Sequence, residues 1–133
     1  MTTTTEIAVG TELPPLRVTP ISRATLALFA GASGDHMPIH IDIDAAKKFG
    51  YDDVFAHGML SMAYLGRLLT DWVPQEKIRS YRVRFTAVTP LHAEPTCTGR
   101  VTAIDDGIAI VELTVTLADG TVTLRGDATI DLT

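Results

Sequence analysis

The stretch from residue 57 to residue 73, HGMLSMAYLGRLLTDWV, restricts the possible folds more than any other part of the sequence. On a helix through these residues, apolar or small side chains occupy nearly every side. A helix of this kind must be covered over most of its surface. Because Pro74 disfavours continuation, we expect the helix to end before it, after about four turns or roughly 25 Å. The chain is therefore predicted to wrap around one central buried helix.

The part of the chain from residue 78 onward can supply this cover. Four segments there alternate apolar and polar residues with a period of two, which is typical of strands with one buried face. An Asp119-Gly120 turn joins the last two segments and predicts a β-hairpin. We therefore expect an α+β fold in which an antiparallel sheet packs on the helix. The alternating apolar residues are Tyr81, Val83, Phe85 and Ala87; Cys97, Val101 and Ala103; Ala109, Val111, Leu113, Val115 and Leu117; and Val122, Leu124, Ala128 and Ile130.

The first half of the chain carries helical start and stop signals instead. Ser22 is placed to cap a helix over Arg23 to Ala30, and Gly31 is placed to end it. A second, short helix is expected to close at Gly50. Its candidate N-caps are Asp42 and Asp44.

Length and charge limit the class of protein. The 133 residues suit one ordinary domain, and 46% hydrophobic against 20% charged residues indicates a compact soluble fold. We expect a single domain over residues 1–133, with residues 1–10 frayed. The net charge of -5 offers no general attraction to nucleic acid or to anionic membranes, so neither is expected as a partner.

Cysteine usage and hydropathy point to the cytoplasm. Cys97 is the only cysteine in the sequence, which rules out an intrachain disulfide and a thiolate metal cluster. The N-terminal residues contain no basic segment followed by an apolar run, and no apolar stretch reaches the roughly 18 residues that a membrane span needs. We therefore expect a cytoplasmic protein.

The segment SGDHMPIH, residues 33–40, carries the most suggestive chemistry. Gly34 supplies backbone freedom and Pro38 disfavours a continuing helix, so the segment is expected to bend. A bend would let Asp35 and His40 face one side, where a carboxylate and an imidazole can exchange protons near neutral pH. The alternative is structural: Asp35 caps the turn through backbone amides and His40 fills a partly buried slot.

The second candidate element is Ala56-His57-Gly58, at the start of the predicted buried helix. Unpaired amides and the positive end of the helix dipole stabilise developing negative charge at such a position. Gly58 has no side chain to block a ligand. An acid-base pair with an amide donor of this kind is what a reaction through an enolate requires. The alternative is a glycine chosen for close packing between helix and sheet.

Other chemistries fit the sequence less well. His36 and His40 are four residues apart, and Asp35 and His57 are further candidate metal ligands, but Pro38 spoils the helical spacing that would align the two histidines. A serine hydrolase is disfavoured because Ser33 has no adjacent base at a recognisable nucleophile elbow.

A basic run, KIRSYRVR at residues 77–84, holds four of the eleven Lys and Arg residues. Two interpretations are open, a solvated strand face and a phosphate-binding patch, and we favour the first. The four residues are Lys77, Arg79, Arg82 and Arg84.

Three motifs resemble the MaoC-type, (R)-specific enoyl-CoA hydratase family: SGDHMPIHID from residue 33, AHGM at residues 56–59 and VRFTAVTP at residues 83–90. The first resembles the family signature S-G-D-x-N-P-(I/L)-H followed by an acidic residue. The resemblance covers about Ile21 to the C-terminus. It implies a hotdog fold, a curved antiparallel sheet wrapped around a long helix. It further implies a homodimer, or a heterodimer with another hotdog subunit, whose sheets join edge to edge.

The resemblance also assigns roles at the site. Asp35 and His40 would form the catalytic dyad acting on a water, and the Gly58 amide would hold the thioester carbonyl. Water would add to a trans-2-enoyl thioester of coenzyme A or an acyl-carrier protein to give the (3R)-3-hydroxyacyl product, or leave in reverse. No metal or redox cofactor is implied. The residues expected to contact substrate are Ser33, Gly34, Met37, Pro38, His57 and Met59. Lys77, Arg79 or other surface basic residues are expected near the phosphates of coenzyme A.

Met37 departs from the family signature, which has Asn at this position. An Asn amide can hold the water or orient the carboxylate, whereas a thioether has no N–H and accepts only weakly. The enzyme would then use another polar group, or be slow or altered in substrate, or serve as a non-catalytic acyl-thioester-binding subunit. The second candidate within enzymes is a hotdog thioesterase. Retention of both Asp35 and His40 argues against a non-catalytic subunit.

Overall fold

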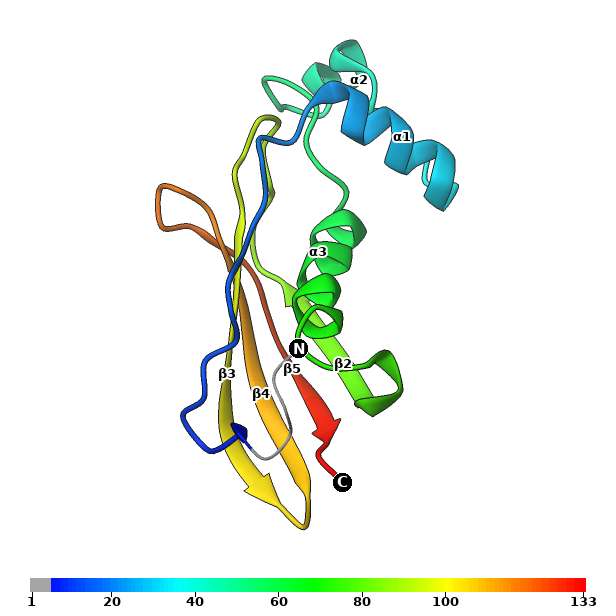
Figure 1. Ribbon diagram of the computed structural model, residues 1–133. Helices are drawn as coiled ribbons and strands as arrows, with labels where there is room; N and C mark the ends of the chain where they lie inside the picture. Colours follow the sequence, from blue (N-terminus) through cyan, green and yellow to red (C-terminus); the bar gives the residue numbers. More distant parts are fainter. Residues whose placement is uncertain (1–5) are drawn as a thin grey trace.

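A five-stranded antiparallel sheet curls around one face of a central helix (Figure 1). The structure, a computed structural model, describes residues 6–133. The strand order is β1-β3-β4-β5-β2, and every neighbouring pair is antiparallel, as the alternating pattern predicted. The strands are β1 (Leu16–Arg17), β2 (Ile78–Phe85), β3 (Thr96–Asp105), β4 (Ile108–Thr116) and β5 (Val122–Asp131).

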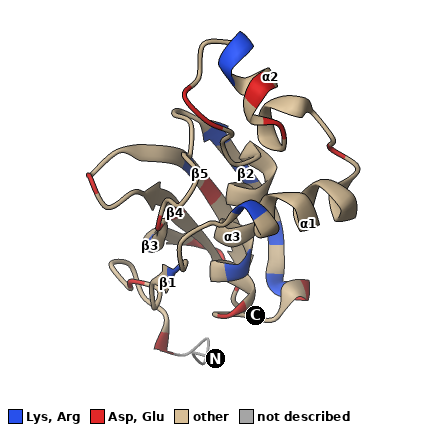
Figure 2. Cartoon of the chain, turned by 90° about the horizontal axis from the view of Figure 1, so that it is seen from above, with Lys and Arg blue, Asp and Glu red and all other residues tan. Residues whose placement is uncertain are grey.

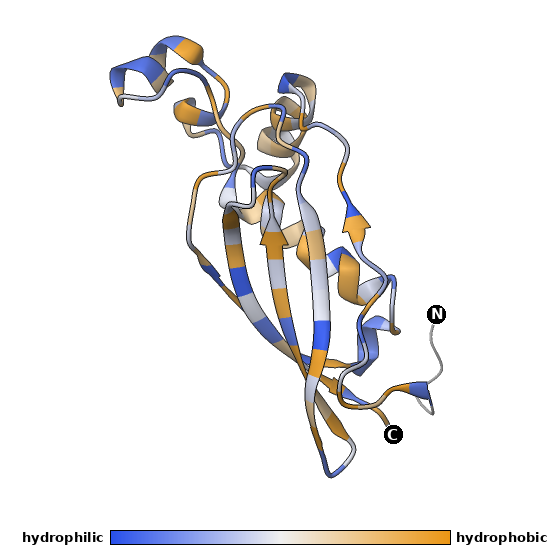
Figure 3. Ribbon diagram, turned by 90° about the vertical axis from the view of Figure 1, so that its left-hand side faces the viewer, coloured by the Kyte–Doolittle hydropathy of each residue, from blue (hydrophilic) through white to orange (hydrophobic). Residues whose placement is uncertain are grey.

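The main core lies between the sheet and helix α3 (Gly58–Thr70). Leu65, Leu68 and Leu69 of the helix meet the inward-facing residues of the strands. Along β4, buried residues alternate with more exposed ones. Figure 3 shows alternating apolar and polar bands along the strands of the sheet. The period of two therefore identified the buried face of the sheet. The fully covered strand residues include Val101, Val111, Leu113, Val115, Ala128 and Ile130.

Helix α3 is shorter and less covered than the sequence predicted. It spans 13 residues instead of the predicted 57–73, because the chain turns at its end and places Trp72 and Val73 in the core. Its other face is open in this chain: Met59 is 56% exposed and Ala63 is also exposed. The apolar residues on nearly every side of α3 therefore belong to two faces. One face packs on the sheet, and the other is uncovered in the single chain.

A separate layer of short helices lies at the N-terminal end of α3 (Figure 1). Helix α1 (Arg23–Ser33) begins at the predicted cap Ser22 but runs through Gly31 and ends at Gly34, whose φ of 78° suits the left-handed cap. The 3-10 helix η2 (Pro38–His40) and helix α2 (Ile43–Lys48) follow, the latter capped by Asp42. The second 3-10 helix, η3 (Gln75–Lys77), leads into β2. This layer has its own small core of Ile21, Leu26, Ala46, Val54, Ala56 and Leu60.

The N-terminal segment is more ordered than predicted. Ile7 is only 7% exposed and packs in the main core, and the Gly10 amide donates to the Val101 carbonyl at 2.8 Å. The predicted frayed segment 1–10 is therefore wrong for residues 6–10, and residues 1–5 lie outside the described part of the chain. Among residues 6–133, no helix has the length and apolar character of a membrane span.

Gly126 of β5 lies where the backbones of β2 and β5 approach each other closely. A Cβ at this position would overlap the backbone carbonyl oxygen of Arg82. We expect Gly126→Ala to lower the free energy of unfolding by about 1–3 kcal/mol, because the neighbouring backbone must shift. Urea denaturation measures this change.

The matched control is Gly31→Ala within α1, where a Cβ would have no atom within 4 Å. This change should raise the free energy of unfolding by about 1 kcal/mol, since alanine favours a helix interior over glycine. An unchanged urea midpoint for Gly126→Ala would contradict the described approach of the two strands.

Candidate active site

The segment from Ser33 to His40 bends as predicted. Gly34 ends α1 in the left-handed conformation and Pro38 opens η2. The Asp35 amide donates to Ser33 Oγ at 3.2 Å, and Asp35 Oδ1 accepts the Met37 amide at 3.2 Å. Asp35 therefore does cap the turn, yet Oδ2 has no hydrogen-bond donor among the described residues. One carboxylate oxygen orients the group and the other is left for chemistry.

His40 is held with one ring nitrogen engaged. Its Nδ1 lies 2.7 Å from the Phe55 carbonyl oxygen, and the His40 residue is only 8% exposed. A carbonyl only accepts, so Nδ1 carries the proton and donates, and Nε2 is the nitrogen that can take a proton. The Phe55 ring packs edge-on against the imidazole, with centroids 5.1 Å apart and planes at 81°. Phe55 thus fixes both the tautomer and the orientation of the His40 imidazole.

His57 is stacked on His40 and is 1% exposed. The two ring centroids are 4.0 Å apart with planes at 26°, and the Phe29 ring meets His57 edge-on at 4.8 Å. The Nε2–H of His57 donates to the backbone carbonyl of Asp35 at 3.1 Å. Burial, and then the nearby charge of His40, lower the pKa of His57 and favour its neutral form. This geometry does not favour the expected contact of His57 with substrate. Instead, His57 connects the Asp35 turn to the start of α3.

Gly58 is the first residue of α3, where a helix leaves its amides without intrahelical partners. A Cβ at Gly58 would lie 3.0 Å from Cδ1 and Cε1 of Phe85, so the glycine also permits close packing of that ring. A pocket of about 340 Å³ adjoins it. The interpretation of close packing is therefore confirmed, and the role of the Gly58 amide as a donor stays a prediction. The pocket is lined by Phe55, Ala56, Gly58, Phe85, residues 86–89 and Leu124.

Asp35, His40 and His57 come together at this point. One oxygen or nitrogen atom from each lies within 4.8 Å of the others, although His57 is 22 residues from Asp35 in sequence. Zinc–nitrogen bonds are about 2.0–2.1 Å long, so these groups would have to draw closer to share a metal. Nδ1 of His40 and Nε2 of His57 bond backbone carbonyls, which leaves Nε2 of His40 and Nδ1 of His57 as the remaining ring nitrogens. At their present spacing these groups can exchange protons through a water, whereas a shared metal would require them to move together.

Most of the other predicted substrate-contact residues lie in or beside this cluster. Ser33, Gly34, Met37 and Pro38 are exposed in the same turn, with Met37 46% exposed, and Met59 is exposed at the start of α3. Sequence reasoning missed Phe55 and Phe85. Phe55 acts through a backbone carbonyl, which any residue type can supply, and the ring of Phe85 reaches Gly58 only through the packing of β2. His36 is exposed and does not join the cluster.

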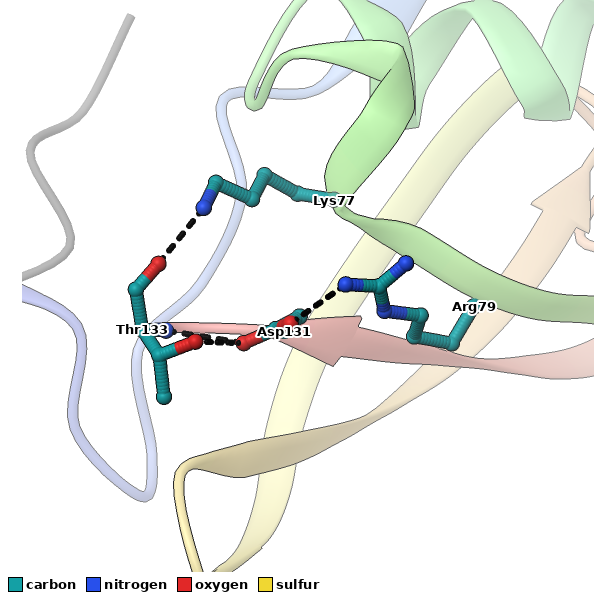
Figure 4. A network of polar contacts seen from close by, with 4 residues as sticks. All are labelled: Lys77, Arg79, Asp131 and Thr133. Atoms are coloured by element: carbon teal, nitrogen blue, oxygen red, sulfur yellow. Dashed lines mark hydrogen bonds and ion pairs between the residues drawn. The ribbon is translucent and has the colours of Figure 1, made fainter.

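Arg79 does not lie with these residues, and its ion pair with Asp131 does not favour the expected contact with the phosphates of coenzyme A. It sits near the start of β2, at the far end of α3 from Gly58, and 13 helical residues span about 20 Å. Its guanidinium bonds Asp131 at 2.6 Å, and Lys77 donates to the Thr133 carbonyl at 2.5 Å (Figure 4). The Thr133 hydroxyl and then Arg79 hold the pKa of Asp131 well below its usual range.

The lowered pKa of His57 predicts how stability depends on pH. Below about pH 6.5 the unfolded chain protonates His57, whereas the folded chain does so only at lower pH, so folding loses stability as pH falls through this range. His57→Phe keeps an aromatic ring but does not titrate. We expect its urea midpoint to fall less between about pH 7.5 and pH 5 than that of the parent protein.

His36→Gln is the matched control, since it removes an exposed histidine of the same region. Its pH dependence should match that of the parent protein. Equal slopes for the parent protein and His57→Phe would show that His57 titrates normally in the folded state.

The likeness to solved structures supports the same fold. R-hydratase PhaJ1 from Pseudomonas aeruginosa, in its unliganded form, matches with a TM-score of 0.86 and 25% identity. The match covers 97% of this chain and 84% of that one. The predicted hotdog arrangement, a curled antiparallel sheet around a long helix, is thereby confirmed.

The sequence comparisons agree. The chain is 37% identical over 94 residues to 3-hydroxyacyl-thioester dehydratase X of Mycobacterium tuberculosis, covering 71% of this chain but only 32% of that protein. It is 31% identical over 108 residues to the 3-oxo-4,17-pregnadiene-20-carboxyl-CoA hydratase beta subunit of the same organism, covering 79% and 81% of the two chains. A family model described as the MaoC like domain matches residues 4–121. Matched over most of its length, this chain belongs to the MaoC-like dehydratase domain family.

Proposed function

We propose that this protein adds water to trans-2-enoyl thioesters to give (3R)-3-hydroxyacyl thioesters, and catalyses the reverse elimination. One observation carries the proposal: His40, with Nδ1 fixed by Phe55, lies beside the Asp35 carboxylate next to the first amides of α3. The relatives that this chain resembles are named as a thioester dehydratase and a CoA hydratase, which supports the same reaction class.

The chemistry follows from these positions. The Gly58 amide holds the thioester carbonyl oxygen and stabilises the enolate that forms on it. Asp35 and His40 hold a water; its oxygen bonds to C3, one of its protons passes to the pair, and a proton is delivered to C2 on the same face. The product gains H at C2 and OH at C3, so the reaction needs no electron acceptor. The pocket beside Gly58 offers room for a group next to the thioester.

The free edge of β2 supports an oligomeric form. β2 pairs only with β5, so one side of it has no strand partner among residues 6–133. Exposed strand edges favour pairing with another chain. We propose that a second hotdog chain, identical or different, covers this edge, and the hydratase relative named as a beta subunit supports such an assembly.

A cytoplasmic location stays a prediction.

Cys97 is fully buried, and burial raises the pKa of its thiol to about 12, so it is an unreactive core residue. It therefore adds no redox chemistry to the proposed reaction.

The dyad is tested by Asp35→Asn and His40→Gln. Each should lower kcat for hydration of trans-2-butenoyl-CoA by about 10²–10⁴-fold, because each removes a group that moves a proton. The loss of enoyl thioester absorbance measures the rate, and chiral analysis identifies the product.

His36→Gln is the control, since this exposed histidine lies between the dyad residues in sequence and outside the cluster. It should retain the parent rate, and urea midpoints should show that all three variants fold. Full activity in both dyad variants, or release of free thiol in place of hydration, would contradict the proposed function.

Met37 is tested separately, because its thioether stands where the family signature has an amide. Its side chain is accessible, with the residue 46% exposed. Met37→Asn should raise kcat by about tenfold, the worth of one hydrogen bond of about 1.4 kcal/mol made in the transition state. Steady-state hydration kinetics give the answer. A rate that does not increase would show that another group already orients the water or carboxylate.

A further inference from the structure

Two arginines that form no ion pair among residues 6–133 face each other on neighbouring strands. Arg84 of β2 and Arg125 of β5 are direct register partners, so their side chains share one face of the sheet. Both residues are exposed, and neither forms an ion pair with a carboxylate among residues 6–133. Like charges directly opposite each other on a sheet cost stability. An anion between them would turn this repulsion into binding.

Two other arginines of β2 do pair with carboxylates, unlike Arg84. Arg82 Nε donates to both carboxylate oxygens of Asp127, at 3.0 and 3.1 Å, and Arg79 bonds Asp131. Figure 2 shows basic and acidic residues together on this pair of strands, and Figure 4 shows the network at the chain end. Within the basic run 77–84, Arg84 is therefore the residue whose opposite partner is also basic.

The position of the pair connects it to the candidate active site. Arg84 directly precedes Phe85, the last residue of β2, whose ring lies against the Gly58 position. Successive strand residues point to opposite faces, so the arginine pair and Gly58 lie on the two sides of the same strand end. A pocket of about 390 Å³ opens on the arginine side. Its lining is Arg82, Val83, Arg84, Arg125, Gly126 and Asp127.

We propose that Arg84 and Arg125 bind a phosphate group of the carrier arm whose thioester is held at Gly58. This inference rests on the proposed function and names a subsite for it. Guanidinium groups bind phosphate oxygens through paired hydrogen bonds, and two of them can neutralise one phosphate dianion. With a net charge of -5, the protein needs such a local site to hold an anionic carrier. The arm reaches Gly58 by passing the end of β2 at Phe85, which is 53% exposed, and not across the β2 edge that is proposed to pair with a second chain.

The phosphate has two possible sources, and the probes separate them. Coenzyme A carries a diphosphate and a 3′-phosphate, 3′-dephospho-coenzyme A carries the diphosphate alone, and pantetheine carries neither. We expect the variant carrying both Arg84→Gln and Arg125→Gln to bind coenzyme A at least tenfold more weakly by calorimetry. Its affinity for pantetheine should equal that of the parent protein. If the double substitution also weakens binding of 3′-dephospho-coenzyme A, the arginines bind the diphosphate. If it leaves binding of that compound unchanged, they bind the 3′-phosphate.

Arg79→Gln is the matched control, since Arg79 lies on the same strand but is paired with Asp131. It should leave coenzyme A binding unchanged. The double variant should unfold at an equal or higher urea concentration, because it removes like-charge repulsion. If it binds coenzyme A as tightly as the parent protein does, or if Arg79→Gln weakens binding equally, the inference is overturned.

Kinetics separate this inference from the proposed function. With trans-2-butenoyl-CoA, the double variant should raise KM at least tenfold and keep kcat, whereas with trans-2-butenoyl-pantetheine both constants should match the parent values. Absence of turnover by the parent protein with both thioesters would reject the proposed function, and calorimetry would still decide the phosphate site. Normal turnover with an unchanged KM for the CoA thioester would reject the phosphate site alone.

Discussion

The packing of α3 against the inner face of the curled sheet is the constraint on which the rest of the structure depends. Leu65, Leu68 and Leu69 are each at most 1% exposed, and they fix the helix along the sheet. With its body fixed, the N-terminal end of α3 has a set position. Gly58 and His57 are therefore presented at one place, and the layer of short helices closes over that end through its own small core.

Polar contacts then join the two layers at that place. His57 belongs to the start of α3, yet it bonds the Asp35 carbonyl and stacks on His40, both from the helical layer. His40 in turn bonds the Phe55 carbonyl just before α3. These contacts hold the carboxylate, the imidazole and the helix amides in one arrangement. This arrangement is the basis of the proposed proton transfer beside an amide donor.

Charge on the outer face of the sheet is arranged by strand register. Arg82 and Arg79 meet carboxylates of β5, but the same register sets Arg84 against Arg125. The end of β2 therefore presents the Phe85 ring toward Gly58, while Arg84 and its β5 neighbour Arg125, neither in an ion pair among residues 6–133, lie on the other face of the sheet. The proposed thioester site and the proposed phosphate site therefore lie on opposite faces of the sheet, next to the same end of β2.

The sequence by itself determined the element types, the alternating buried face and the candidate residues Asp35, His40 and Gly58, because periodicity, caps and motif spacing are local. It overextended α3, since apolar character alone cannot show that Trp72 and Val73 turn back into the core. Only the tertiary structure decided that Arg79 lies far from Gly58, that His57 binds the Asp35 turn, and that Phe55 and Phe85 complete the site. Those outcomes depend on strand register and on backbone carbonyls, which residue types do not reveal.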